Sequence, residues 1–164
     1  MKFYNVKDEY IQYLKLFDDK VADNKVETRP YVGVVIEINE IKYYAPFASP
    51  KPKHRKMKNS KDFRKIKQGE YGAINFNNML PVNDDALLPI DIEHLEDEKY
   101  KRLLQNQYNY IRADQAQIMR SAKEVRRIAF AQDGELTNYD KIIKNRTCDL
   151  PLLEDACKRY MICQ

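Results

Sequence analysis

The sequence contains no uninterrupted apolar run of the roughly 20 residues that a membrane-spanning helix requires. Its first residues lack the apolar core and small-residue cleavage site of a secretory signal. Only three cysteines occur, and this odd number at irregular spacing matches no paired zinc framework: Cys148, Cys157 and Cys163. These absences argue against a membrane span and a disulfide or zinc scaffold, and they predict a cytoplasmic protein with reduced thiols.

Positive charge is concentrated in one segment, residues 51–67, which reads KPKHRKMKNSKDFRKIK. It holds nine Lys or Arg residues and a single acid, Asp62, in a chain whose formal net charge is only +4. The remainder carries 20 basic against 24 acidic residues, so the charge is focused on one loop. Such focusing is typical of a surface that binds a polyanion, and nucleic acid is the polyanion that we expect.

The length of 164 residues is most simply that of one domain, residues 1–164. A chain of this size buries roughly 70% of its unfolded surface, so it needs no disulfide or metal to fold. It contains no internal repeat and no low-complexity tract. We therefore expect one core and a single functional unit.

The first half of the chain is dominated by strand patterns. β-branched and aromatic residues fill Tyr31 to Ile38 and Ile41 to Phe47, and the two residues between them, Asn39-Glu40, predict a hairpin. A helix with apolar residues at helical spacing is expected from Asp8. Further strands are expected at residues 2–6, 71–76, 79–82 and 87–92. Together these segments predict a small, strongly bent antiparallel sheet or barrel.

The second half of the chain changes to helical periodicity. Apolar residues recur every three or four positions from Tyr100 to Ala129, which predicts one long helix from Asp97 that ends near Gly134. A capping-box pattern at Ser121 suggests a break or kink there. Two shorter helices should follow, with Thr137 and Asp149 as their N-caps. The predicted fold class is therefore α+β, with an N-terminal helix, a long helix and C-terminal helices.

The turn Ser49-Pro50-Lys51 ends the predicted hairpin and begins the basic segment. RNA can be cut without a metal if its own 2′-hydroxyl attacks the adjacent phosphorus, which requires a proton acceptor, cations near the phosphorane and a donor for the leaving 5′-oxygen. The products are a 2′,3′-cyclic phosphate and a 5′-hydroxyl. A rigid hairpin can present a hydroxyl and an ammonium group to one phosphate, so Ser49 and Lys51 are our candidate catalytic pair. Without further context, a Ser-Pro-Lys sequence is more often only a turn.

Other basic and aromatic residues are candidates for RNA contacts rather than chemistry. His54 is a bystander or phosphate contact more readily than a general base. Tyr110 and Arg112 could stack on unpaired bases. The acidic residues around His94 fit no two-metal spacing, so neither a metal site nor a cofactor is predicted. The full set of candidate RNA contacts is Ala48, Lys53, His54, Arg55, Lys56, Lys58, Lys61, Arg64, Tyr110 and Arg112.

Five motifs in order resemble a known family. They are MKFY with Tyr10 in the following helix, RPYVGVVIEI, YYAPFASPK, GAINFNNMLPV and YIRAD. Each motif is weak on its own, but their order and spacing resemble the ToxN/AbiQ family of type III toxin–antitoxin endoribonucleases. The likeness extends from the first strand to the long helix and so covers most of the chain.

This resemblance implies a compact barrel similar to the MazF/Kid toxins and metal-independent cleavage of messenger or phage RNA. It also implies inhibition by, and processing of, a repeated pseudoknot antitoxin RNA that joins toxin molecules into a ring-like assembly. In the family the loop matching Ser49 to Lys51 lines the active site. Ala48 stands where relatives often carry Thr, so one hydroxyl contact is missing. Arg29 would supply a second cation, and Tyr10 matches a family tyrosine near the site, although it could equally be a core aromatic.

Two other functions remain open from the sequence. A non-catalytic RNA-binding module would use the same basic segment and would not depend on Ser49. A protein-interaction domain would bind RNA weakly and without the steep salt dependence of phosphate contacts.

Overall fold

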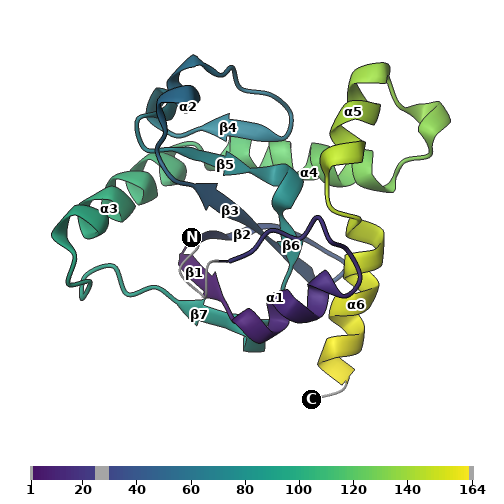
Figure 1. Cartoon of the computed structure of the whole chain (residues 1–164), viewed down its shortest axis with the longest axis horizontal. Helices are drawn as coiled ribbons and strands as arrows, with labels where there is room; N and C mark the ends of the chain where they lie inside the picture. The colour runs from purple at the N-terminus through teal and green to yellow at the C-terminus, as the bar shows by residue number, and fades with distance from the viewer. Residues whose placement is uncertain (1, 25–29, 163–164) are drawn as a thin grey trace.

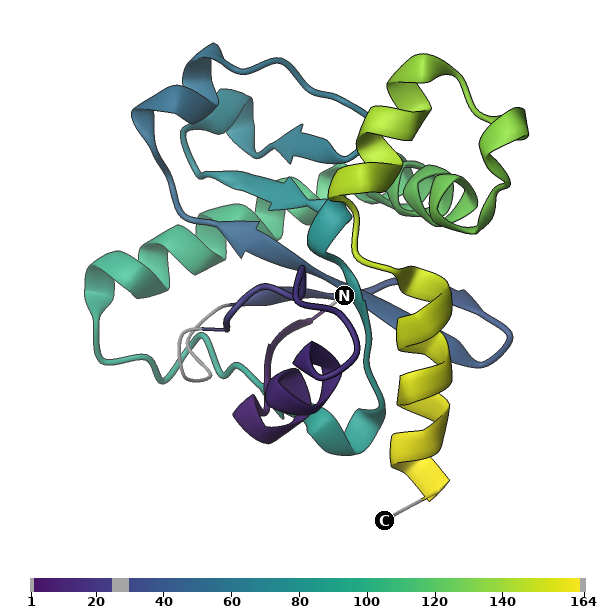
Figure 2. The ribbon, with the colours of Figure 1, turned by 45° about the vertical axis from the view of Figure 1, so that its right-hand side comes forward.

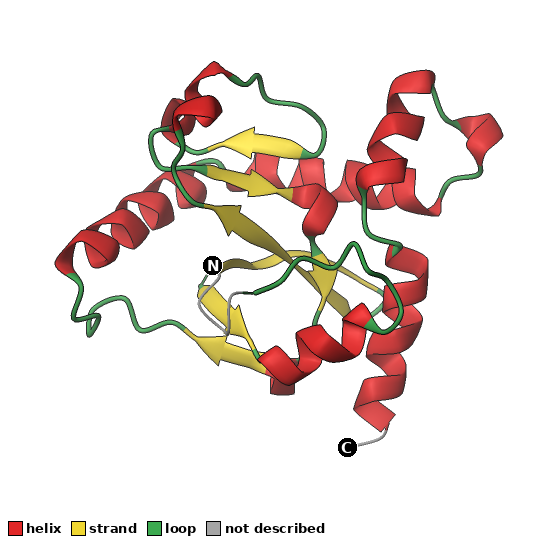
Figure 3. Cartoon of the chain, viewed as in Figure 1, coloured by secondary structure: helices red, strands yellow, loops and turns green. Residues whose placement is uncertain are grey.

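The structure, a computed structural model, describes residues 2–24 and 30–162 and contains an antiparallel sheet with helices packed around it (Figures 1 and 3). The strand order is β4-β5-β3-β2-β1-β7, and β6 pairs separately with β3. The strands are β1 (Phe3–Val6), β2 (Tyr31–Ile38), β3 (Ile41–Ala48), β4 (Phe63–Lys65), β5 (Ala73–Asn75), β6 (Leu80–Pro81) and β7 (Leu87–Pro89). The prediction of an α+β fold with a strongly bent antiparallel sheet is confirmed.

The β2–β3 hairpin is the longest strand pair and was predicted with its turn. Asn39 and Glu40 both have positive φ, 52° and 66°, which is the geometry of a tight hairpin turn that matches the twist of the flanking strands. The pairing register shifts between Val32 and Ile36, so β2 carries a bulge. A bulge bends its strand and increases the local twist, which helps this small sheet to curl.

Strand β3 pairs with two different strands along the edge away from β2. Tyr43 and Tyr44 pair with β6, whereas Phe47 and Ala48 pair with β5. One edge of β3 is therefore shared by β6 and β5, and the end of β3 lies between β2 and β5. Ser49 directly follows this end, so a rigid part of the sheet fixes where the next residues begin.

In the part of the chain that the structure describes, six α-helices pack around the sheet. They are α1 (Asp8–Lys15), α2 (Pro52–Lys56), α3 (Glu98–Ala113), α4 (Gln115–Phe130), α5 (Asn138–Arg146) and α6 (Leu150–Ile162). Helices α1 and α6 lie together, because the Tyr13 hydroxyl donates to the Ala156 carbonyl at 2.8 Å and both Tyr10 and Tyr13 have ring centroids 4.9 Å from that of Tyr160. Helices α3 and α4 run one after the other behind the sheet (Figure 2).

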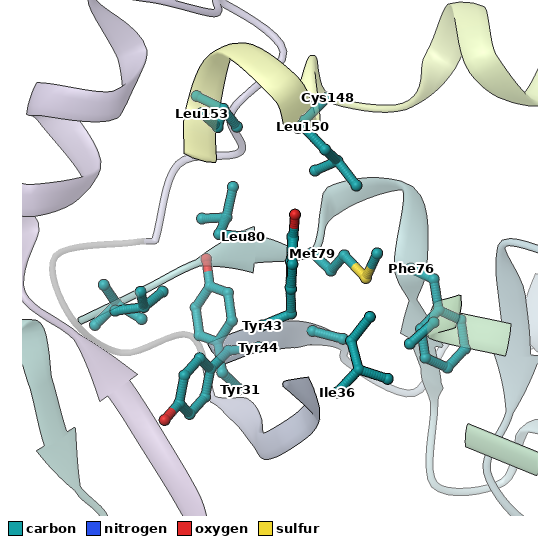
Figure 4. Close-up of a cluster of buried hydrophobic side chains, with 14 of the residues drawn as sticks. Tyr31, Ile36, Tyr43, Tyr44, Phe76, Met79, Leu80, Cys148, Leu150 and Leu153 are labelled. Atoms are coloured by element: carbon teal, nitrogen blue, oxygen red, sulfur yellow. The ribbon is translucent and has the colours of Figure 1, made fainter. Parts of the chain in front are cut away.

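The core lies between the sheet and these helices. Tyr43 and Leu80 from the sheet, Met79 beside it and Leu153 of α6 are fully buried together (Figure 4). Burial of each large apolar side chain contributes about 1.5–3 kcal/mol of transfer free energy. The buried Tyr43 hydroxyl donates to Glu154, which also binds Arg126, so its polar atom is satisfied within the core.

The predicted long helix is wrong in one respect: two helices meet at Asp114, and the break is not at Ser121. Asp114 has φ −100° and ψ 10°, outside the helical range, and its carbonyl accepts the Ile118 N–H that opens α4. The Asp114 carboxylate pairs with Arg64 instead of capping its own helix. Asp is unfavourable inside a helix and tolerated at its start, so this ion pair stabilises the break. Helix α4 ends at Phe130, before Gly134.

The prediction that residues 51–67 form a loop is also wrong. The segment contains helix α2 and strand β4, and β4 pairs with β5 through Phe63 and Asn75. Asp62, the only acid in the segment, is buried and accepts two hydrogen bonds from Arg146 at 2.6 and 2.7 Å. Buried and paired in this way, Asp62 joins the segment to α5.

The C-terminal helices start where the sequence predicts. The Thr137 side chain accepts the Asp140 N–H at 3.1 Å, and the Asp149 side chain accepts the Leu152 N–H at 3.2 Å. Each bond satisfies one of the backbone donors that a helix start leaves free. Cys148 and Cys157 are buried, free thiols. Within the described ranges, no helix combines the length and apolarity that crossing a membrane requires.

Candidate active site

A pocket with a volume of about 630 Å³ opens beside the end of β3. Its mouth is formed by Ser49, Lys51 and Lys53 from the turn and from α2. Its inner wall comes from β1, the segment after β7 and the first half of α3. In Figure 1, α2 lies above the end of β3 and α3 lies to its left. The lining residues that the argument uses below are Asn5, Phe47, Ala48, Ser49, Lys51, Lys53, His54, Asn75, Tyr100, Leu103, Leu104 and Gln107.

The turn after β3 is held by main-chain packing from Gly72. A Cβ atom on Gly72 would lie 2.1 Å from the Ala48 carbonyl oxygen and 3.2 Å from the Pro50 nitrogen. Gly72 also has φ +88°, which other residues rarely adopt. Only glycine therefore lets the main chain directly before β5 approach the turn so closely, and this contact fixes the position of Ser49 and Lys51. The sequence marked Gly72 only as the first residue of a family motif.

The first half of the basic segment presents unpaired cations to solvent. Lys51 is extended and precedes Pro52, the first residue of α2, and its carbonyl accepts the His54 N–H at 2.9 Å. All five cations of this half are exposed and have no ion-pair partner among residues 2–24 and 30–162: Lys51, Lys53, Arg55, Lys56 and Lys58. Their charges remain available for phosphate groups.

His54 lies inside this cationic surface and not on it. Its side chain is buried, and its ring centroid is 5.8 Å from that of Phe63. Burial, followed by the nearby charges of Lys53 and Lys51, lowers the pKa of His54 below its usual value of 6.5. The imidazole is therefore neutral at pH 7 and supplies no positive charge to a phosphate, in contrast to the contact considered from the sequence.

The second half of the basic segment uses its cations to bind other parts of the protein. Lys61 donates to Asp140 at 2.7 Å and to Glu124 at 3.1 Å, and these bonds raise the pKa of Lys61. Arg64 makes a two-bond ion pair with Asp114. Both residues were expected to contact RNA. The structure commits their charges to α4, α5 and the α3–α4 junction.

Tyr10 is not brought to the pocket. Tyr10 is fully buried in α1, donates its hydroxyl to the Pro81 carbonyl at 2.8 Å and packs against Tyr160. Burial is the main cause that raises its pKa far above the usual value of 10. It lines no part of the pocket, so the structure places it as a core aromatic. Arg29 lies outside the described residues.

Tyr110 and Arg112 also lie away from the pocket, near the end of α3. Tyr110 is half-buried and packs on the core, whereas Arg112 is exposed. Ala48 and Asn75 do line the pocket, from β3 and β5. Because the sequence separates these two strands by more than 20 residues, their pairing is what brings both residues to one site.

The inner wall contains polar residues that sequence reasoning missed. Gln107 is buried on α3, and Asn5 lies on β1. Tyr100, a half-buried aromatic, adds an apolar surface beside them. A signal for Gln107 was present: it stands three residues after Leu104 and four before Ile111, on the buried face of its helix. A polar residue at such a position indicates a buried hydrogen bond or a site.

The pocket can bind a phosphate at its mouth, because the exposed residues that line it there carry a hydroxyl and two ammonium groups. Its apolar inner wall can exclude water, which strengthens electrostatic interactions with a bound charge. Among the residues that the structure describes, no cluster of three or more His, Cys, Asp or Glu side chains is suited to hold a metal ion.

Comparison with known proteins gives a consistent result at the level of sequence. Residues 2–158 match the model of a family described as toxin ToxN of type III toxin–antitoxin systems. The endoribonuclease ToxN of Pectobacterium atrosepticum is 31% identical, over 98% of this chain and 94% of the relative. The endoribonuclease ToxN of Bacillus thuringiensis subsp. kurstaki is 32% identical, over 97% of this chain and 84% of the relative. The endoribonuclease AbiQ of Lactococcus lactis subsp. lactis is 31% identical, over 98% and 89%.

Solved structures agree. A structure described as a toxin selectively inhibited by a non-coding RNA pseudoknot has a TM-score of 0.84 and 31% identity, and the match covers 98% of this chain and 97% of the other. A structure of AbiQ, a lactococcal anti-phage endoribonuclease, has a TM-score of 0.78 and 27% identity over 98% and 97% of the two chains.

Proposed function

This chain belongs to the ToxN family of type III toxin–antitoxin endoribonucleases, and from this premise we propose that it cuts RNA at the Ser49–Lys51 turn without a metal. The cut would serve growth arrest and phage defence, as the description of AbiQ as anti-phage supports. We place residues 1–164 in one catalytic domain that acts in the cytoplasm, where its RNA substrates are. The observation that carries the proposal is that the exposed residues Ser49, Lys51 and Lys53 line one pocket beside the end of a rigid strand.

The proposed reaction is an internal transesterification. The 2′-oxygen of the substrate attacks the adjacent phosphorus, a bond forms between them, and the bond from phosphorus to the 5′-oxygen breaks. The 2′-proton leaves to a base, and the 5′-oxygen gains a proton. The products are a 2′,3′-cyclic phosphate and a 5′-hydroxyl.

Lys51 has the charge that this reaction needs. Its ammonium group would stabilise the extra negative charge on the phosphorane oxygens, a role for which one donor is typically worth 10²–10³ in rate. Ser49 would hold the scissile phosphate by a hydrogen bond. Arg29 is proposed as a second cation from its position in the family motif. Tyr10 would act only indirectly, by keeping α1 in place.

We further propose that an antitoxin RNA occupies the same cationic surface as the substrate. The similar toxin that is inhibited by a non-coding RNA pseudoknot supports this assignment. The cations of α2 would contact its phosphates, and a repeated RNA processed by the toxin would join neighbouring proteins into a closed, ring-like assembly. One surface then serves both substrate and inhibitor.

The test is incubation of purified protein with single-stranded RNA in excess EDTA, followed by analysis of the product ends. Wild type should leave cyclic phosphate and 5′-hydroxyl ends, and Ser49→Ala and Lys51→Ala should lose cleavage. Ser121→Ala and Lys141→Ala, which change the same residue types outside the pocket, are matched controls and should retain it. Intact RNA that is nevertheless bound tightly by wild type would support the non-catalytic RNA-binding module instead.

A further inference from the structure

The inner wall of the pocket has a polar atom with no partner, in a place where water is largely excluded. Gln107 is 2% exposed, and its Nε2 donates to the Tyr71 carbonyl at 2.7 Å. A carbonyl can only accept, so this bond fixes which end of the amide is nitrogen. The other end, Oε1, is buried and has no hydrogen-bond partner among the described residues. Buried acceptors of this kind are normally satisfied, and an exception calls for an explanation.

A second acceptor lies in the same wall. Asn5 lines the pocket from β1, and its buried Oδ1 also has no partner within the part of the chain that the structure describes. Asn5 and Gln107 come from different elements more than 100 residues apart, so the fold brings to one pocket two residues whose amide oxygens have no partner among the described residues. Two such groups beside an unoccupied volume are typical of a ligand site with a few placed polar groups.

The rest of the wall is suited to a flat ring. Leu103, Leu104 and Phe47 supply apolar contacts, and Tyr100 is an aromatic of the kind on which unpaired bases stack. The volume of about 630 Å³ lies within the range of small-ligand pockets, about 300–1,000 Å³. The mouth carries Ser49, Lys51 and Lys53, which suit a phosphate. A cationic mouth with an apolar interior that ends in hydrogen-bond acceptors matches one nucleotide.

We propose that this inner wall binds a nucleobase flanking the cut and that Gln107 Oε1 selects a base with an amino group at N6 or N4, that is, adenine or cytosine. Adenine N6 and cytosine N4 are donors, whereas guanine O6 and uracil O4 are acceptors at the corresponding positions. A keto oxygen facing Oε1 would leave two acceptors buried against each other. An amino group instead gives Oε1 the partner it lacks. Gln107 is thus a specificity-determining residue, and this assignment rests on the proposed nuclease function.

The experiment begins with cuts that wild type makes on a long single-stranded RNA, mapped at nucleotide resolution. The nucleotides on either side of the principal cut are then replaced one at a time in a short substrate. Adenosine is changed to purine riboside, which lacks the amino group, or to inosine, which has a keto oxygen, and cytidine is changed to uridine. We expect kcat/KM to fall by about tenfold or more at one of the two positions, in line with the loss of one buried hydrogen bond.

The same substrates are then compared with Gln107→Leu and with Gln105→Leu as the matched control. Gln105 is on the same helix and does not line the pocket. Gln107→Leu should reduce the discrimination between amino and keto bases to within about threefold, and Gln105→Leu should leave it unchanged. A purely structural role of Gln107 would lower kcat/KM for all substrates equally and keep the ratio.

The outcomes separate the two proposals. If wild type cuts no RNA, the proposed function fails. If wild type cuts but tolerates every base on both sides, prefers keto bases, or keeps its discrimination after Gln107→Leu, the nuclease stands and the base-selection proposal is overturned. If Gln107→Leu does not fold, the wild-type ratios between adenosine, purine riboside and inosine still decide, because equal rates would overturn the proposal and a tenfold preference for the amino base would support it.

Discussion

The two halves of the basic segment have similar compositions, but their cations differ in whether they form ion pairs within the protein. Residues 51–58 contain five Lys or Arg, and residues 61–67 contain four. The first five are exposed and have no ion-pair partner among the described residues, around a pocket that Lys51 and Lys53 line. In the second half Lys61, Arg64 and Lys67 all pair with carboxylates. The first half is available to bind a polyanion, whereas the second half mainly holds the fold together.

The partners explain the difference. Asp114, Glu124 and Asp140 lie on or beside α4 and α5, 50 or more residues after the cations that they bind. Arg127 and Lys61 hold the pKa of Glu124 at about 2, far below its usual value, so this carboxylate stays charged at all physiological pH values. A run of positive charge is therefore not in itself a binding surface. What matters is which of its members the fold leaves unpaired.

The largest expected effect is that of a substitution in residues 51–58 that lowers RNA cleavage and leaves the stability of the protein unchanged. Lys51→Ala should lower RNA cleavage by about 100-fold or more, because one charge-stabilising donor is removed at the phosphorane. Its unfolding free energy should change by less than about 0.5 kcal/mol, since the side chain is exposed. Cleavage assays and urea unfolding measure the two effects. If stability fell and cleavage did not, Lys51 would have a structural role, as the cations of residues 61–67 do.

Removal of three unpaired cations together should mainly weaken the binding of RNA. Lys53, Arg55 and Lys56, changed to Gln, should lower RNA affinity about 50-fold at 0.15 M salt and reduce the log–log salt slope by about 2, because each lost phosphate contact contributes about 0.7 on single strands. Fluorescence anisotropy over a salt series provides both numbers. An unchanged slope would mean that α2 does not contact phosphates.

For the paired cations of residues 61–67 we expect the reverse: a substitution should lower stability and leave RNA cleavage nearly unchanged. Arg64→Met should destabilise the protein by about 1–2 kcal/mol and lower Tm by about 3–6 °C, because Asp114 is left partly buried without its partner. Cleavage by the folded protein should stay within about threefold of wild type. The neighbouring Lys65→Met, which removes a cation without a described ion pair, is the control and should leave Tm nearly unchanged. Loss of cleavage with an unchanged Tm would place Arg64 at the RNA.

The smallest effect concerns His54, the buried residue within the exposed half. Because its folded pKa is lowered, the unfolded chain takes up a proton first as pH falls below about 6.5, and the folded state then loses stability. His54→Gln should therefore flatten the decline in stability between pH 6.5 and 5. Denaturant unfolding at several pH values measures this slope, and the two proteins should run parallel between pH 7 and 8. Identical slopes below pH 6.5 would contradict a buried neutral imidazole.

Local signals in the sequence were sufficient for much of this fold. The β2–β3 hairpin follows from nearly continuous β-branched and aromatic residues on either side of Asn39-Glu40, and the caps at Thr137 and Asp149 follow from side chains that bind their own helix starts. The break at Asp114 could not be read in this way, because it is stabilised by Arg64, 50 residues earlier. Helical periodicity continues across the break, so the pattern alone predicted one helix.

The residues of the candidate site also differ in whether local sequence signals could identify them. Ser49 and Lys51 were accessible from the sequence, because turn chemistry, charge and family motifs all fall on consecutive residues. Asn5 was not, and the helical spacing of Gln107 indicated only its burial, because strand pairing and the placement of α3 bring both residues to the pocket. Tyr10 shows the opposite case: a family motif drew attention to a side chain that the fold places in the core. Its hydroxyl meets the Pro81 carbonyl and not a substrate.

The contact of Gly72 with the Ala48–Pro50 main chain has a consequence for how this family can vary. A turn that rests on backbone atoms does not depend on the size of the side chains around it. Neighbouring positions such as Ala48 can then exchange side chains while the main chain of the Ser49–Lys51 turn keeps its placement. The pocket wall and the turn can therefore change independently of each other.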